Sequence, residues 1–254
     1  MHRLGQVFLH DKNILDKLVA QANIQPGDTV VEIGCGHGIL TERLVAAGAS
    51  LTVIEIDPDC MAKTQDRLAS RFDVVPPITW VCGDVLTQTL SGKPAQVVAN
   101  IPYYISKEIV LWLVRNRTAI AQVQLMVQQE FFDKLRAKPG SPNYGFLSAL
   151  MGLYGKFGPH FPVSRRSFRP VPHVDSTVFS FAFNPTPPPQ EAELFALLQA
   201  AFWGKRRALK TVLKKNPFWQ PSAKALEHLD SLPSTLRAQD LAPEAFLDLG
   251  IALF

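Results

Sequence analysis

The chain has 254 residues, of which 47% are hydrophobic and 19% are charged, with a formal net charge of +4 and an isoelectric point near 9.0. That length supports a buried core in one large domain and a small one. No apolar run approaches the roughly 18 residues of a membrane span, and the N-terminus shows no signal or transit pattern, so we expect a cytoplasmic protein without a membrane partner. The three cysteines and six histidines lack metal-ligand or disulfide spacing, so we expect no metal site.

The first hundred residues alternate helical and strand patterns, in the order typical of a parallel, doubly wound sheet. The expected elements in chain order are a helix over 14–19, a strand over 29–33, a helix over 40–47, a strand over 51–54, a helix over 59–70, and strands over 78–81 and 95–99. The glycine turn 34–38 follows the first strand. Candidate ligand groups therefore lie at the carboxyl ends of strands, where open α/β sheets bind their ligands.

The pattern continues with a helix over 108–113, a strand over 122–127, helices over 128–137 and 146–150, and a strand over 176–183. The stretch 158–172, rich in Pro, Phe and Arg, is predicted to be irregular. Four prolines within 185–189 predict a stiff linker, and the rest of the chain reads as helical. We therefore predict an α/β domain over 1–184 and a small all-α domain over 185–254.

The glycine turn Gly34-x-Gly36-x-Gly38 lets the backbone approach a ligand closely, although an ordinary tight turn would look the same. It departs from the G-x-G-x-x-G pattern of dinucleotide sites. Glu55, about 20 residues on, suits the hydroxyls of a ribose, and Asp84 could accept from an adenine amino group or cap a helix beginning at Val85. Together with Asn100, these residues predict an S-adenosylmethionine site on a Rossmann-like sheet.

The tetrapeptide Asn100-Ile101-Pro102-Tyr103 suits chemistry on a planar amine. The lone pair of such an amine is delocalised into its ring and must be drawn out by hydrogen-bond acceptors. Asn100 Oδ1 and the backbone carbonyl of Ile101 or Pro102 can accept both amine protons, and Tyr103 can stack on the ring. The tetrapeptide therefore predicts methyl transfer to adenine.

Two basic clusters predict a nucleic-acid substrate. The first comprises Lys205, Arg206, Arg207, Lys210, Lys214 and Lys215, with no acidic residue between Phe202 and Gln220. The second comprises Arg165, Arg166 and Arg169, interleaved with Phe161 and Phe168. A merely solvated basic face is the alternative for the first cluster.

Several motifs in order resemble the KsgA-type ribosomal RNA adenine dimethyltransferases, and the resemblance covers almost the whole chain. They are the segments 4–9, 32–34, 100–106, 129–130, 138–141, 144–145, 168–176, 206–210 and 237–241. The resemblance implies dimethylation of two adjacent adenosines near the 3′ end of small-subunit (16S) rRNA. It also implies S-adenosylmethionine as cofactor and an assembling 30S subunit as partner, and we expect a monomer.

The resemblance also implies roles for individual residues. Cofactor contacts fall to Gln6, Val7, Leu9, Gly34, Gly36, Glu55, Asp84 and Asn100, with Val7 acting through its backbone. The target adenine is held by Asn100, Pro102 and Tyr103, and its pocket is lined by Tyr104 and Phe168. Arg165, Arg166, Arg206, Arg207 and Lys210 are expected to contact the RNA.

Three alternatives remain open at this point. Methylases of large-subunit rRNA share Asn-Ile-Pro-Tyr, although the segments 138–141 and 168–176 fit the small-subunit branch better. A non-catalytic assembly or transcription factor on the same scaffold would be expected to have lost cofactor residues, which are present here. A DNA adenine methylase usually carries Pro at the position of Ile101.

Overall fold

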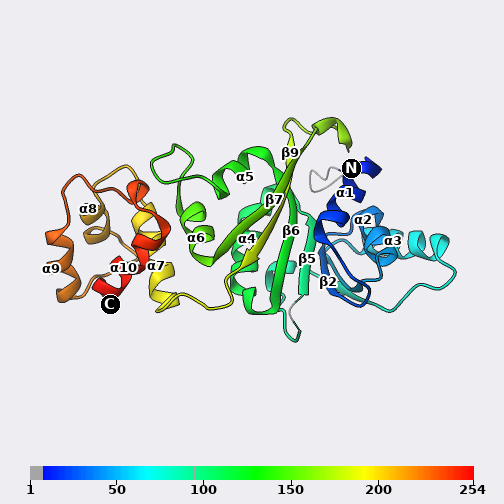
Figure 1. The fold of residues 1–254 in the computed structure, drawn as a ribbon, viewed down its shortest axis with the longest axis horizontal. Coiled ribbons are helices and arrows are strands. Elements are labelled where there is room, and N and C mark those ends of the chain that lie inside the picture. The colour runs from blue at the N-terminus through cyan, green and yellow to red at the C-terminus, as the bar shows by residue number, and fades with distance from the viewer. Residues whose placement is uncertain (1–7, 94) are drawn as a thin grey trace. The chain divides into compact units, whose positions relative to one another are not determined.

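The computed structural model describes residues 8–93 and 95–254, and Figure 1 shows its elements. Its centre is a seven-stranded sheet in the order β4-β3-β2-β5-β6-β9-β7. The strands are β2 Thr29–Ile33, β3 Ser50–Glu55, β4 Ile78–Cys82, β5 Ala95–Asn100, β6 Ile120–Gln128, β7 Gly155–Val163 and β9 Ser176–Phe183. A separate two-stranded sheet pairs β1 Phe8–Leu9 with β8 Phe168–Arg169. No helix in the described ranges is long and apolar enough to cross a membrane.

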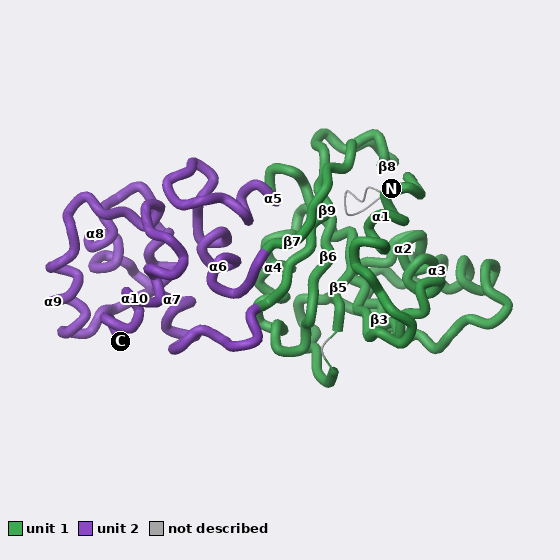
Figure 2. The backbone as a smooth tube through the Cα atoms, in the orientation of Figure 1, with its two compact units in different colours: residues 1–131, 157–183 green, residues 132–156, 184–254 purple. Residues whose placement is uncertain are grey.

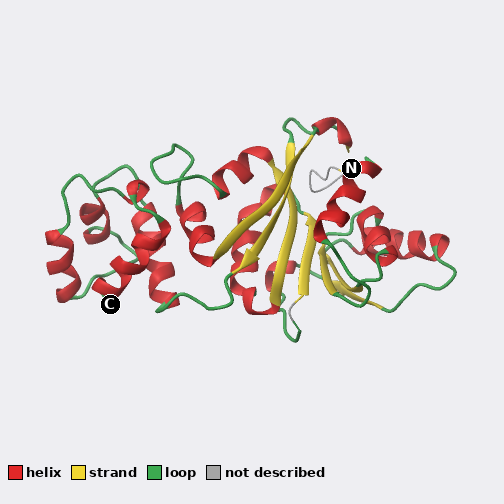
Figure 3. Cartoon of the chain, viewed as in Figure 1, coloured by secondary structure: helices red, strands yellow, loops and turns green. Residues whose placement is uncertain are grey.

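Helices alternate with the strands, as Figure 3 shows. Those of the N-terminal two-thirds are α1 Lys12–Ala22, α2 Ile39–Ala46, α3 Pro58–Arg71, α4 Ser106–Arg115, α5 Gln129–Leu135 and α6 Phe146–Tyr154. α1, α2 and α3 lie side by side. Leu18 and Leu44 from the first two of these helices are fully buried in one hydrophobic core with Val30 and Val53 of the sheet. The helical and strand periodicities of the sequence therefore predicted the elements, and burial of their apolar faces joins them.

The order in which the chain adds strands to the sheet reverses at β2. From β2 the chain adds β3 and β4 on one side, whereas β5 and β6 are added on the other side, all in parallel. The carboxyl ends of β2 and β5 therefore lie next to each other at a topological switch point, which is where doubly wound sheets open a crevice for ligands. β9 then pairs with β6 in the antiparallel direction. The predicted strands at 29–33 and 176–183 are confirmed with the same bounds.

The prediction that 158–172 is irregular was wrong, because β7 occupies Gly155–Val163. Its two prolines masked the strand pattern, but β7 is the edge strand, where a missing backbone N–H is tolerated. Ser180 Oγ of the neighbouring β9 donates to the carbonyl of Pro159 at 3.1 Å. A Cβ at Gly158 would lie 2.5 Å from that same hydroxyl, so the strand approaches β9 more closely than a side chain would allow.

The chain divides into two compact units, coloured in Figure 2. One comprises residues 1–131 and 157–183 and contains most of the sheet. The other comprises 132–156 and 184–254, with α7 Glu191–Phe202, α8 Leu209–Lys214, α9 Ala223–Ser231 and α10 Pro243–Leu253. The predicted boundary after 184 is next to the change of unit after 183, whereas 132–156 group with the C-terminal helices. Within that unit Tyr144 Oη donates to the carbonyl of Leu241 at 2.8 Å.

Candidate active site

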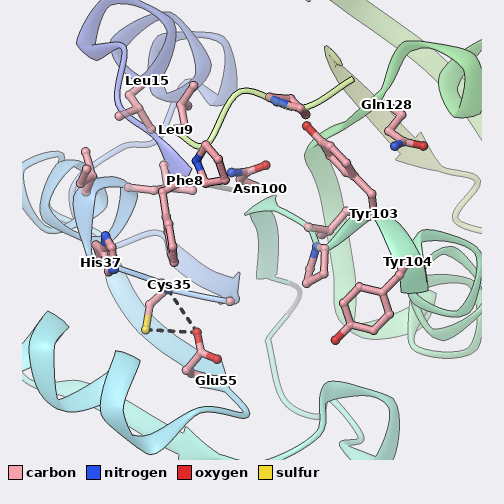
Figure 4. A pocket seen from close by; sticks show the side chains of 18 of the residues that line it. Phe8, Leu9, Leu15, Cys35, His37, Glu55, Asn100, Tyr103, Tyr104 and Gln128 are labelled. Atoms are coloured by element: carbon pink, nitrogen blue, oxygen red, sulfur yellow. Dashed lines mark hydrogen bonds between the residues drawn. The ribbon is translucent and has the colours of Figure 1, made fainter. Parts of the chain in front are cut away.

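A cavity of about 690 Å³ opens at the switch point of the sheet, a size typical of small-molecule sites. Figure 4 shows its side chains. Eight of the residues predicted to bind cofactor or target base line it: Leu9, Gly34, Gly36, Glu55, Asn100, Pro102, Tyr103 and Tyr104. They come from β1, from the turn after β2, from the end of β3 and from the end of β5. The fold therefore brings together residues that are up to 95 positions apart in the sequence, Leu9 and Tyr104.

The turn after β2 requires glycine for two physical reasons. Gly36 and Gly38 have positive φ values of 53° and 74°, a region that side chains disfavour. A Cβ at Gly36 would lie 3.2 Å from the Phe8 ring, and one at Gly38 would lie 2.7 Å from Thr64 Cγ2. The turn thus packs too closely for larger residues, and it brings the backbone to the wall of the cavity.

Glu55 holds this turn from the end of β3. Its Oε2 accepts from Gly36 N–H at 3.1 Å and from the Cys35 thiol at 3.6 Å, while its Oε1 accepts from Asp57 N–H at 3.0 Å. The first two bonds are the dashed lines of Figure 4. A carboxylate has about four acceptor positions, so Glu55 retains capacity for ligand hydroxyls while it is 5% exposed.

Phe8 and His37 form a wall of the cavity that the sequence did not indicate. Their rings stack with centroids 3.8 Å apart and planes inclined by 12°. Phe8 is held there because β1 pairs with β8 and His10 N–H donates to the carbonyl of Ser167 at 3.0 Å. The motif segment 4–9 could have suggested Phe8, but nothing in the sequence pairs it with His37.

Asn100 ends β5, with its side chain half-buried in the cavity, and the turn Tyr103–Ile105 follows. The carbonyl of Pro102 already accepts from Ser106 Oγ at 3.3 Å and from Ile105 N–H at 3.4 Å. The Tyr103 hydroxyl is 2.6 Å from Ser176 Oγ of β9. Burial raises the pKa of Tyr103 above its ordinary value of 10.0, so the hydroxyl stays protonated at neutral pH.

Four predicted residues of this unit are placed elsewhere. Asp84 caps the short helix Val85–Thr87 through Leu86 N–H at 2.9 Å and is absent from the cavity lining, so the structure shows the capping role. Phe168 is fully buried in the core and does not line the cavity, because β8 turns its ring inward. Arg165 and Arg166 are exposed outside the cavity lining. Predicted contacts of Gln6 and Val7 lie outside the described residues.

Arg165 fastens the loop that borders the cavity. Its guanidinium donates to the carbonyl of His173 at 3.1 Å, and its N–H donates to Asp175 Oδ1 at 2.8 Å. Pro170, Val171 and His173 of that loop line the cavity. Arg165 therefore has a structural role at this loop beside any contact with a substrate.

In the helical unit, Arg206 and Arg207 are exposed. Lys210, in contrast, donates through Nζ to the carbonyl of Leu232 at 3.3 Å, so this predicted RNA contact is engaged within the protein.

A buried carboxyl group lies behind the glycine turn. Glu32 of β2 is fully buried, and neither of its oxygens has a hydrogen-bond partner within ordinary geometry. Burial raises its pKa from 4.5 to about 8, and the nearby Glu55 raises it further. Burial likewise raises the pKa of the Cys35 thiol. Within the described ranges, no group of three or more His, Cys, Asp or Glu side chains could hold a metal ion.

The doubly wound sheet and its cavity place the protein in the class of S-adenosylmethionine-dependent methyltransferases. The structure matches a dimethyladenosine transferase from Plasmodium falciparum with a TM-score of 0.80 at 28% identity, covering 95% of each chain. The chain belongs to the ribosomal RNA adenine dimethylase family, whose sequence profile matches residues 1–251.

Two further comparisons support this membership. A ribosomal RNA small subunit methyltransferase A from Chlorobium chlorochromatii is 38% identical, covering 97% of this chain and 91% of the relative. The 23S rRNA methyltransferase ErmE matches with a TM-score of 0.69 at 26% identity, covering 97% of this chain and 99% of the other. The predicted family, fold class and enzyme class are therefore confirmed.

Proposed function

We propose that this protein transfers methyl groups from S-adenosylmethionine to the exocyclic amines of two adjacent adenosines near the 3′ end of 16S rRNA, in an assembling 30S subunit in the cytoplasm. The observation that carries this proposal is that Asn100, Pro102 and Tyr103 line the same switch-point cavity as the turn held by Glu55. The relatives named as small-subunit methyltransferases support the choice of substrate.

The residues of the cavity fit the cofactor. Gly34, which lines the cavity and has open space where a Cβ would lie, leaves room for close approach of a ligand, and Glu55 retains acceptor capacity for ribose hydroxyls. Phe8 and the exposed Ile56 supply apolar surface for an adenine ring, and both line the cavity. Bound there, S-adenosylmethionine would supply a methyl group already activated by its sulfonium centre.

The chain's own residues would then prepare the nucleophile. The target adenine leaves its stack and enters the cavity, as bases do in enzymes that modify them. Asn100 Oδ1 would accept a hydrogen bond from one amine N–H and the carbonyl of Ile101 from the other, since the Pro102 carbonyl is already engaged by Ser106. The nitrogen that gains the methyl group would then release one proton to water. Tyr103 stacks on the ring and fixes its plane. Positioning therefore supplies most of the catalysis, on the order of several kcal/mol.

The test is incorporation of labelled methyl from S-adenosylmethionine into small ribosomal subunits that lack the modification, with the labelled nucleoside identified by mass. Wild-type protein should yield dimethyladenosine at two adjacent positions near the 3′ end. At saturating cofactor, Asn100→Ala should lose at least about a hundredfold in turnover, as for loss of a transition-state hydrogen bond. The control is Gln122→Ala on β6. Asn116→Ala is not suitable, because the Asn116 side-chain oxygen accepts a hydrogen bond from Leu90 N–H.

Two results would reject the proposal. Label in large-subunit rRNA and none in the small subunit would assign the protein to the activity named for the ErmE structure. Full turnover by Asn100→Ala would show that the amine is activated by other groups.

A further inference from the structure

Two aromatic side chains of the helical unit are exposed to solvent. Trp203, which follows α7, is 53% exposed, and Phe218, which follows α8, is 87% exposed. Aromatic rings bury more area than most side chains and are normally covered. A pair of open rings on a small helical unit therefore indicates a contact surface.

The buried side chain of Asn216 ties the two segments together. The carbonyl of Ala200 accepts from Asn216 Nδ2 at 3.3 Å and also from Trp203 N–H at 3.3 Å. Asn216 Oδ1 accepts in turn from Phe218 N–H at 2.8 Å. Because Asn216 is only 7% exposed, this satisfied amide fixes the segments of Trp203 and Phe218 at one place on the unit.

Three cations of the neighbouring basic cluster are committed to the protein itself. Lys205 Nζ donates to the carbonyls of Pro142 and Tyr144, each at 3.0 Å, Lys210 donates to a carbonyl, and Lys214 pairs with Asp230. The ammonium groups of these three lysines are engaged within the helical unit, and that of Lys214 is also charge-paired, so they are less free to reach a partner.

The other three cations of the cluster remain available. Arg206, Arg207 and Lys215 are exposed, and within the described ranges their side chains make no hydrogen bond or ion pair. No Asp or Glu occurs between Phe202 and Gln220. The open aromatic pair is therefore accompanied by unpaired positive charge, which selects a partner that has both negative charge and apolar flat surfaces.

We propose that Trp203 and Phe218 form a stacking platform for unpaired nucleotides of RNA, whose phosphates contact Arg206, Arg207 and Lys215. Every unpaired base offers a face on which an aromatic ring can stack, and cations then track the backbone. A duplex conceals its base faces and offers only phosphates and groove edges. This inference rests on the proposed RNA substrate and adds the form of RNA that the helical unit recognises.

The experiment measures the affinity of the full-length protein for two RNAs of equal length, one unstructured and one a fully paired hairpin. Trp203→Ala and Phe218→Ala should each weaken binding of the unstructured RNA about fivefold or more, and binding of the hairpin less than twofold. Trp203→Phe should retain most of the affinity. Ile251→Ala, which truncates another exposed apolar side chain of the same unit, should change neither affinity.

Salt dependence separates stacking from charge. Arg206→Gln should weaken binding of both RNAs and reduce the slope of log affinity against log salt concentration by about 1, whereas Trp203→Ala should leave the slope unchanged. Thermal melting and cofactor affinity of each variant establish that the protein is folded.

Three results would overturn the platform: unchanged affinities in both ring variants, equal losses on the two RNAs, or a loss confined to assembled subunits with naked RNA unaffected, which would indicate a protein partner. The binding assay needs no methyl transfer. A wild-type protein that binds unpaired RNA through these rings but methylates no rRNA would reject the proposed function and leave the platform in place.

Discussion

The Tyr103 hydroxyl lies 2.6 Å from Ser176 Oγ, although the two residues are 73 positions apart in the chain. Tyr103 follows β5, whereas Ser176 begins β9, and β6 lies between these strands in the sheet. Ser176 is fully buried, whereas Tyr103 is half-buried at the cavity, so the bond anchors to the core the ring that is expected to stack on the target base.

We predict that Tyr103→Phe and Ser176→Ala each lower kcat by about fivefold, because either change releases the ring from its position, at about 1 kcal/mol for a lost hydrogen bond. The double variant should be no slower than the slower single variant, since both remove one interaction. Methylation kinetics measure this. Multiplying losses would show that the two hydroxyls act independently. Ser180→Ala is the matched control, because its hydroxyl bonds Pro159 at the sheet edge instead.

Gly38→Ala should destabilise the protein by about 2 kcal/mol or more, because it combines a left-handed φ of 74° with a contact of 2.7 Å to Thr64 Cγ2. Adding Thr64→Ser, which removes that methyl group, should restore part of the loss. Gly92→Ala separates the two causes, since Gly92 has a φ of 96° and open space around it, and should cost only about 1 kcal/mol. Denaturant unfolding measures all three. Equal losses for Gly38→Ala and Gly92→Ala would show that the contact is unimportant.

Glu55→Gln should lower cofactor affinity about tenfold or more and reduce the melting temperature. Each carboxylate oxygen accepts a backbone N–H, one from Gly36 and one from Asp57. An amide keeps one acceptor but turns its NH₂ group toward the other donor, which leaves a buried group unpaired. Asp84→Asn is the control for stability, because only one oxygen accepts there and the amide can replace it. Calorimetric titration with the cofactor measures the affinity of each variant. An affinity of Glu55→Gln equal to that of wild type would contradict the prediction.

Glu32→Gln should stabilise the protein at alkaline pH and have little effect near pH 4.5. The folded protein raises the pKa of Glu32 from 4.5 to about 8, because burial disfavours its charged form and the nearby Glu55 adds to this, against a smaller opposing effect of Thr41. The folded state therefore holds a proton that the unfolded state releases, and wild-type stability falls as pH rises from about 4.5 to about 8. A neutral amide removes this dependence. Glu32→Gln should therefore be more stable than wild type by on the order of 1–3 kcal/mol at pH 8 and above.

Melting temperatures of wild type and Glu32→Gln across pH 4.5–9 measure this prediction. Glu108→Gln, an exposed substitution on α4, should give a difference that does not grow with pH. A constant difference between wild type and Glu32→Gln would contradict the assigned protonation of the buried carboxyl.

The sequence by itself determined most of the elements, because a strand such as 29–33 and the amphipathic helix that follows are set by the local spacing of apolar residues. It also pointed to Asn100 and the glycine turn as candidate site residues, and the structure places both at strand ends that line the cavity. It failed for β7, whose prolines are acceptable only because the strand lies at an edge, and for Phe168, whose placement depends on β1 pairing with β8.

Only the tertiary structure decided which long-range partners meet: Phe8 on His37, Ser176 on Tyr103, and Asn216 between the segments of Trp203 and Phe218. It also decided that Lys210 serves the fold and that Asp84 caps a short helix. Local sequence patterns determine secondary structure, because they depend on residues that are close together in the chain. Hydrogen-bond partners and burial depend on strand order and packing, which involve residues far apart in the sequence.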